Sequence, residues 1–208
     1  MLTFDQAGAF VLAALLITAS PGPDNLMVLG MGMSRGRAAG VAFGLGCALG
    51  CLSHTLLAAV GVSALVAASP LAFTLLKMAG GLYLCWLGWH ALRSAGGTTA
   101  AQAQGAPQSL GRLFAKGLLA NAINPKVVLF FLSFLPQFVD TARGEVAGQT
   151  AALGLLFTLQ AALLFGTLGL FAGQVGQWLQ RRPRAGLWLD RVAGTVFIGL
   201  GVRLILSR

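Results

Sequence analysis

The chain is a succession of long apolar runs separated by short polar connections. Each run has roughly the 20 residues that a helix needs to cross the hydrocarbon layer of a bilayer. Since these runs occupy nearly all of residues 1–208, they predict an all-α integral membrane protein with a single transmembrane domain. The six predicted spans cover about residues 7–33, 39–62, 70–92, 113–138, 148–179 and 187–206.

Proline motifs interrupt the first and the fourth run, PGPD from Pro21 to Asp24 and INPK from Ile123 to Lys126. Proline lacks a backbone donor and clashes with the preceding turn, so we expect helices 1 and 4 to be broken. The tetrapeptides KMAG (77–80) and RVAG (191–194) also open runs in corresponding places. Three spans in each half would insert the halves in opposite orientations, as two inverted three-helix repeats. The predicted boundaries are about 1–95 for repeat 1, 96–111 for a linker and 112–208 for repeat 2.

Composition and charge agree with a membrane protein. Only 9% of the residues are charged and 57% are hydrophobic, whereas a soluble domain has about 25% charged residues. The net charge of +9 does not indicate a nucleic-acid partner, because the cations form no patch interleaved with aromatic residues. They lie in short connections, which the positive-inside rule assigns to the cytoplasm. We therefore expect the links at Arg35–Arg37, Arg93–Arg112 and Arg181–Arg184 inside, and Asp140–Glu145 outside with both termini.

The interrupted runs also carry charged residues that are costly to place in hydrocarbon. Asp24 follows the first break, at the expected cap of the restarted helix, and Lys126 follows the second. We expect the two side chains to approach each other, with Asp24 holding a substrate ammonium and Lys126 a substrate carboxylate. The alternatives are a kink with Asp24 as cap, a purely structural ion pair, and a Lys126 side chain that reaches the membrane surface. The candidate substrate-binding residues are Pro21, Gly22, Pro23, Asp24, Asn25, Lys77, Asn121, Asn124, Pro125 and Lys126.

Four segments, in order along the chain, carry a family resemblance: ASPGPDNLMVL, GRAAG, LKMAGGLYLCWLG and NAINPKVVLFFLSFLPQF. Together they resemble the LysE/RhtB family of amino-acid exporters over essentially the whole chain. The resemblance implies export of amino acids or close derivatives across the bacterial inner membrane, driven by the proton gradient or the membrane potential. Asp24 is the only carboxylate deep in a predicted span, which favours neutral over basic amino acids.

Other functions remain open at this stage. One is export of another small solute such as a metal ion, although no His-rich or Cys/His-rich loop is present. Another is a membrane thiol-redox protein, although Cys47 and Cys51 have no basic neighbour and are expected to fill space. The chain has no G-x-x-x-x-G-K-[ST] loop for ATP hydrolysis. We expect a transporter and not an enzyme, with no cofactor and no bound metal.

Glycines at small-xxx-small spacing allow helices to approach closely. They are compatible both with packing inside one chain and with a homodimer in the bilayer. The pairs are Gly40/Gly44, Gly46/Gly50 and Gly169/Gly173.

Overall fold

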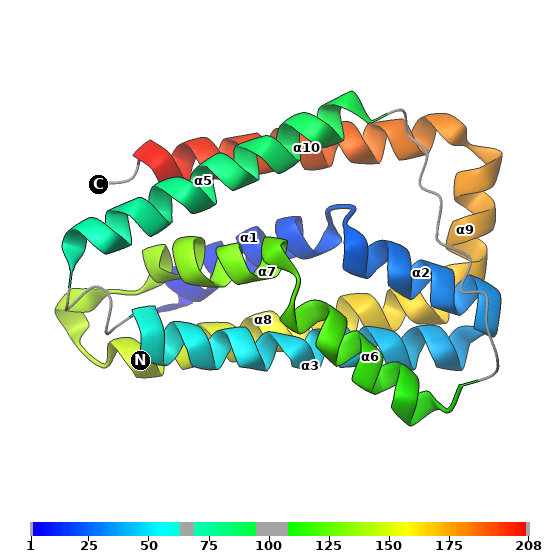
Figure 1. The fold of residues 1–208 in the computed structure, drawn as a ribbon, viewed down its shortest axis with the longest axis horizontal. Helices are drawn as coiled ribbons and strands as arrows, with labels where there is room; N and C mark the ends of the chain where they lie inside the picture. The colour runs from blue at the N-terminus through cyan, green and yellow to red at the C-terminus, as the bar shows by residue number, and fades with distance from the viewer. Residues whose placement is uncertain (1, 63–68, 95–107, 207–208) are drawn as a thin grey trace.

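The computed structural model describes residues 2–62, 69–94 and 108–206, and all the regular secondary structure within them is helical (Figure 1). The predicted linker at about 96–111 lies mostly outside the described residues. The first half contains α1 (Phe4–Ala19), α2 (Pro23–Arg35), α3 (Arg37–Leu57), the π-helical turn η1 (Ala58–Val62) and α5 (Pro70–Arg93). The second half contains α6 (Leu110–Ala122), α7 (Pro125–Leu129), η2 (Phe130–Phe134), η3 (Leu135–Phe138), η4 (Thr141–Arg143), α8 (Val146–Leu170), α9 (Ala172–Arg181) and α10 (Pro183–Leu206).

Each half opens with a broken helix, as the proline motifs predict. The axis turns by 58° between α1 and α2, and by 50° between α6 and the helical segment at Pro125–Phe138. Two long helices follow each break, α3 and α5 in the first half and α8 and α10 in the second, where the short helix α9 lies between them. Opposite insertion of the halves stays a prediction.

Three unbroken helices of the described chain are long and apolar enough to cross a membrane, namely Arg37–Gly61, Leu71–Arg93 and Val146–Leu170. Counting each bent pair as one span raises the number to five. Helix α10 is not among them, and its sequence includes Asp190 and Arg191. It nevertheless packs along α5 (Figure 1), so a sixth span stays a prediction.

The fifth predicted span, 148–179, is too long. Helix α8 ends at Leu170, and α9 begins at Ala172 and turns across the end of the molecule (Figure 1). The physical reason is a change in the pattern of polar residues. α8 is apolar around most of its circumference, whereas α9 exposes Gln174, Gln177 and Gln180 on one face. A helix with one polar face is typical of a surface or membrane boundary.

Most of the long helices pack in two groups, and α1 and α7 run between them (Figure 1). α5 and α10 lie side by side as one layer, while α2, α6 and α8 pack around α3 in the other group. Glycines make the crossings close. A Cβ on Gly81 would lie 2.9 Å from the backbone oxygen of Gly201, and one on Gly40 would lie 3.0 Å from the Cα of Gly169. The absence of side chains at these positions lets the helix backbones approach each other.

Most of the glycines that we singled out are therefore engaged inside the chain. An added Cβ would lie within 4 Å of a neighbouring helix of the same chain at Gly40, Gly44, Gly46, Gly50 and Gly169, whereas at Gly173 it would meet open space. A homodimer through glycine-rich faces stays a prediction.

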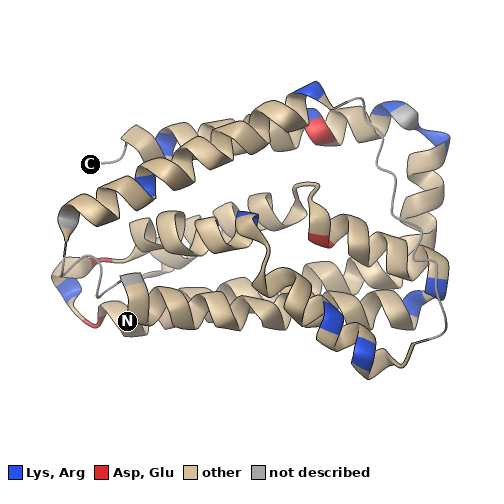
Figure 2. Ribbon diagram, in the orientation of Figure 1, with Lys and Arg blue, Asp and Glu red and all other residues tan. Residues whose placement is uncertain are grey.

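The outer surface and the charge distribution fit a bilayer. Large apolar side chains are exposed on several helices, including Ile123 at 80% and Leu163 at 67%. Figure 2 shows Lys and Arg gathered at the end of the molecule that holds α9 and the starts of α3 and α6. The link with Asp140 and Glu145 lies at the opposite end, as the sequence predicts. Which end faces the cytoplasm stays a prediction.

Candidate functional site

The first break separates α1 from α2. α1 ends at Ala19, and Gly22 serves as the N-cap of α2 with extended backbone angles (φ −169°, ψ 176°). Pro23 occupies the first turn, where its missing N–H costs no hydrogen bond. Asp24 is therefore not the cap, contrary to our prediction. No side chain caps α2, so the N–H groups of Asp24 and Asn25 have no acceptor within the described residues.

The second break follows the prediction closely. α6 ends at Ala122, and the backbone N–H of Asn124 donates to the backbone oxygen of Asn121 at 2.9 Å. The Asn124 side chain then caps α7 by accepting from the Lys126 N–H at 3.1 Å. Pro125 holds the first helical position, as it does in many helices.

The two breaks meet and hold each other's charged residue. Asn121 Nδ2, from the second break, donates to Asp24 Oδ2 at 2.8 Å. Lys126 Nζ, also from the second break, donates to the Ser20 backbone oxygen at 3.0 Å. That oxygen is available because α1 ends before a following helical N–H can reach it. Asp24 and Lys126 themselves form no ion pair within 4.0 Å in this conformation.

Both charged side chains are almost completely buried. Asp24 is 4% exposed and Lys126 is 7% exposed. Within the described residues each makes one hydrogen bond through its charged group, and Lys126 Nζ also lies 5.3 Å from the centre of the Phe197 ring. An ionised carboxylate can accept about four hydrogen bonds and an ammonium donates three. Each group therefore keeps unused capacity for a ligand of opposite charge.

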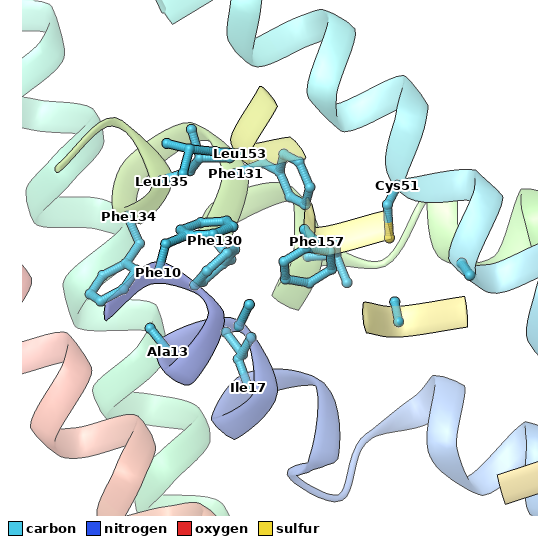
Figure 3. Close-up of a cluster of buried hydrophobic side chains, with 14 of the residues drawn as sticks. Phe10, Ala13, Ile17, Cys51, Phe130, Phe131, Phe134, Leu135, Leu153 and Phe157 are labelled. Atoms are coloured by element: carbon cyan, nitrogen blue, oxygen red, sulfur yellow. The ribbon is translucent and has the colours of Figure 1, made fainter. Parts of the chain in front are cut away.

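Asp24 and Lys126 line the same small cavity. This cavity has room for about one water molecule. One part of the lining is polar, and the other is formed by apolar side chains such as Ile17, Phe130 and Phe157, which lie together in Figure 3. The complete lining is Ile17, Thr18, Asp24, Asn25, Cys51, Asn121, Lys126, Val127, Phe130, Phe157 and Phe165. An amino acid does not fit until the cavity widens.

The remaining candidates differ in their relation to the cavity. Asn25 lines it and donates through Nδ2 to the Thr18 backbone oxygen at 2.9 Å. Gly22 leaves room for the Lys126 side chain, because a Cβ at this position would lie 3.0 Å from Lys126 Nζ. Lys77 is half-buried in α5 and is not part of the lining.

Sequence reasoning missed several residues around the cavity. Cys51 lines it instead of only filling space, and its thiol donates to Asn121 Oδ1 at 3.5 Å. His54 Nε2 lies 3.0 Å from the Asn121 backbone oxygen, so this ring nitrogen carries the proton. Cys47, Cys51 and His54 follow one another at helical spacing in a mostly apolar run. That spacing was the available signal for a polar face directed at the second break.

The described residues contain no group of three or more His, Cys, Asp or Glu residues that could hold a metal ion.

The chain matches known proteins over most of its length. The family model described as LysE type translocator matches residues 15–208. A threonine efflux protein of Escherichia coli (strain K12) is 35% identical over 198 residues, which cover 91% of this chain and 92% of that protein. A homoserine/homoserine lactone efflux protein of Salmonella typhimurium is 30% identical over 210 residues, covering 100% of this chain and 99% of that protein. An uncharacterised membrane protein of Pseudomonas aeruginosa is 35% identical over 202 residues, covering 94% and 92%. No solved structure matches.

Proposed function

This chain belongs to the LysE type translocator family, and from that membership we infer that it exports amino acids. We propose more specifically that it moves neutral amino acids, or close derivatives, out of the bacterial cytoplasm across the inner membrane. The relatives carry the names threonine efflux protein and homoserine/homoserine lactone efflux protein. Both named amino acids are neutral, which supports the proposal.

The observation that carries the proposal is the unused hydrogen-bonding capacity of two opposite charges in one cavity. Asp24 can accept from the α-ammonium group of an amino acid, and Lys126 can donate to its α-carboxylate. The uncapped N–H groups of Asp24 and Asn25 lie at the positive end of the α2 dipole, where a carboxylate is also favoured. A zwitterion would thus bring one partner for each buried charge.

The rest of the lining favours an uncharged side chain. Among the described residues that line the cavity, Asp24 is the only acid, and the α-ammonium group engages it in the proposed complex. The side chain of a lysine would place a second cation among Phe130, Phe157 and the existing cation of Lys126. An unpaired charge is expensive to bury, so basic amino acids should bind poorly.

Transport requires a conformational change, since the cavity has room for about one water molecule. In the proposed cycle the α5–α10 layer shifts against the group around α3, and the cavity opens to one side of the membrane at a time. Phe197 of α10 lies over Lys126, so this movement would uncover the carboxylate site. The proton gradient or the membrane potential would supply the energy.

The test is an efflux assay with the purified chain in liposomes. Liposomes are loaded with radiolabelled threonine, homoserine, valine or lysine, and the loss of label is followed with and without an imposed pH gradient or potassium diffusion potential. The neutral amino acids should leave several-fold faster than from liposomes without protein, while lysine should not. Failure to export any amino acid under either gradient would refute the proposal. Equal export of lysine and the neutral amino acids would refute the predicted preference.

A further inference from the structure

A groove rich in arginine lies on the surface where α9 meets α10. Its volume is about 550 Å³, which is within the range of small-ligand sites. It shares no lining residue with the cavity at the two breaks. The end of α9, the start of α10 and the residue between these helices together supply the lining, which is Trp178, Arg181, Arg182, Arg184, Ala185 and Trp188.

The positive charge of this groove is not balanced by the protein. Arg181, Arg182 and Arg184 are exposed, and none of them forms an ion pair within the described residues. No acidic residue belongs to the described lining. Figure 2 shows the basic residues of both helices gathered at this corner of the molecule. Guanidinium groups bind phosphate oxygens in pairs of parallel hydrogen bonds, so the groove favours an anion that carries phosphate.

The position of the groove matches the level of the lipid headgroups. α9 has only 10 residues, and it runs across the end of the molecule between the apolar helix α8 and α10 (Figure 1). Trp178 and Trp188 are 47% and 65% exposed, and tryptophan is enriched where the membrane meets water. The positive-inside rule assigns this end to the cytoplasmic leaflet, whose surface potential is negative.

An apolar surface continues from the groove along α10. Val192 follows Trp188 by four residues, which places the two side chains on one face of the helix. Val192 is 57% exposed, and Leu189 beside it is 43% exposed. A free phosphate ion makes no use of such a surface, whereas an acyl chain attached to the bound phosphate would cover it. The combination therefore favours a phospholipid over a soluble anion.

We propose that the groove between α9 and α10 binds the headgroup of an anionic phospholipid. The phosphate group would lie among the three arginines, and an acyl chain would follow α10 past Val192. α9 packs against α2 and α8, whereas α10 packs against α5, so the bound lipid would join the two groups of helices. The lipid site goes beyond the proposed function and does not depend on it, because it uses a different surface of the protein.

Quenching of tryptophan fluorescence by brominated lipids tests the lipid site. Trp86→Phe and Trp89→Phe leave Trp178 and Trp188 as the only tryptophans, and both line the groove. This chain is reconstituted into phosphatidylcholine vesicles that contain a small fraction of brominated phosphatidylglycerol or, separately, of brominated phosphatidylcholine. The ratio of the two association constants should favour phosphatidylglycerol several-fold. One cation near an anionic lipid contributes up to about fivefold, so a triple variant should bring the ratio to within about twofold of one. This groove variant combines Arg181→Gln, Arg182→Gln and Arg184→Gln.

A matched variant removes three other cations from the same end of the molecule. Its substitutions are at exposed positions outside the groove and change the net charge by the same amount, namely Arg37→Gln, Arg112→Gln and Lys116→Gln. It should keep the preference for phosphatidylglycerol. An equal loss in both triple variants would overturn the lipid site, because general attraction between charges would then explain the binding. Equal quenching by the two brominated lipids before any arginine is replaced would also overturn it. An excess of inorganic phosphate should leave the quenching unchanged, and full relief would assign the groove to a soluble anion instead.

Discussion

Removing one of the two buried charges should damage both the stability and the transport of this protein. Asp24→Asn keeps the size of the side chain and can still accept from Asn121, but it removes the anion closest to Lys126. Lys126→Met removes the cation and leaves Asp24 with the Asn121 bond alone. The double variant removes both charges, so neither ion is left in the cavity without its counterpart.

The structure sets the size of the effect. The charged atoms of Asp24 and Lys126 are more than 4.0 Å apart. At an effective dielectric constant of about 20, their attraction is therefore below about 4 kcal/mol. A buried ion that loses its partner typically costs about 3–5 kcal/mol, and here both ions keep another hydrogen bond. We expect each single variant to lower the free energy of unfolding by about 2–4 kcal/mol. The loss in the double variant should be smaller than the sum of the single losses by about 1–4 kcal/mol.

The free energy of unfolding is measured on the purified variants in detergent, with tryptophan fluorescence as the signal. Efflux from liposomes measures transport, which all three variants should lose because the receptor for a zwitterion is incomplete. Glu145→Gln and Lys116→Met are control substitutions that each remove a charge at an exposed position, and they should change stability by less than about 0.5 kcal/mol. Additive losses in the double variant would show that the two charges do not interact. A single variant that exports at the normal rate would show that its charge does not bind substrate.

Three further predictions concern packing, access and orientation. Gly40→Ala should destabilise the fold by about 1–3 kcal/mol, because the added Cβ would lie 2.9 Å from a backbone atom of α2 and 3.0 Å from one of α8. Gly166→Ala has open space and should be neutral or stabilising by up to about 1 kcal/mol, and similar unfolding of the two variants would contradict the packing argument. Cys51 lines the cavity, so a bound substrate should shield its thiol. In a variant whose only cysteine is Cys51, a saturating concentration of an exported amino acid should slow the reaction of this thiol with a maleimide several-fold. An unchanged labelling rate would place the substrate elsewhere. Single cysteines at Thr141 and Arg182 should react with an impermeant thiol reagent from outside only at Thr141, and the opposite result would invert the topology.

The parts of the fold that the sequence predicts are those that depend on local chemistry. Pro125 preceded by Asn124 specifies both a helix end and a side-chain cap, and the second break has both. At the first break the same reasoning put the cap on Asp24, whereas Gly22 has that position. The preference of proline for the first helical position places the cap immediately before Pro23, and gives the observed boundary.

The parts that the sequence did not predict depend on which helix faces meet. Thr18 and Gln160 stand 142 positions apart, and nothing in the local sequence indicates that their side chains form a hydrogen bond. The hydrogen bond between Asn121 and Asp24 likewise depends on how the two breaks are placed relative to each other. A difference of one turn in either helix would select other partners.

The two-group arrangement of the helices also has an evolutionary consequence. Every residue that lines the cavity comes from α1, α2, α3, α6, α7, η2 or α8, and within the described chain none comes from α5 or α10. If the proposed cycle is correct, selectivity and the moving layer are encoded in separate stretches of the gene. After a gene duplication, one copy could acquire a new cargo through a few substitutions around the cavity. The glycine contacts that join α5 to α10 would be inherited unchanged.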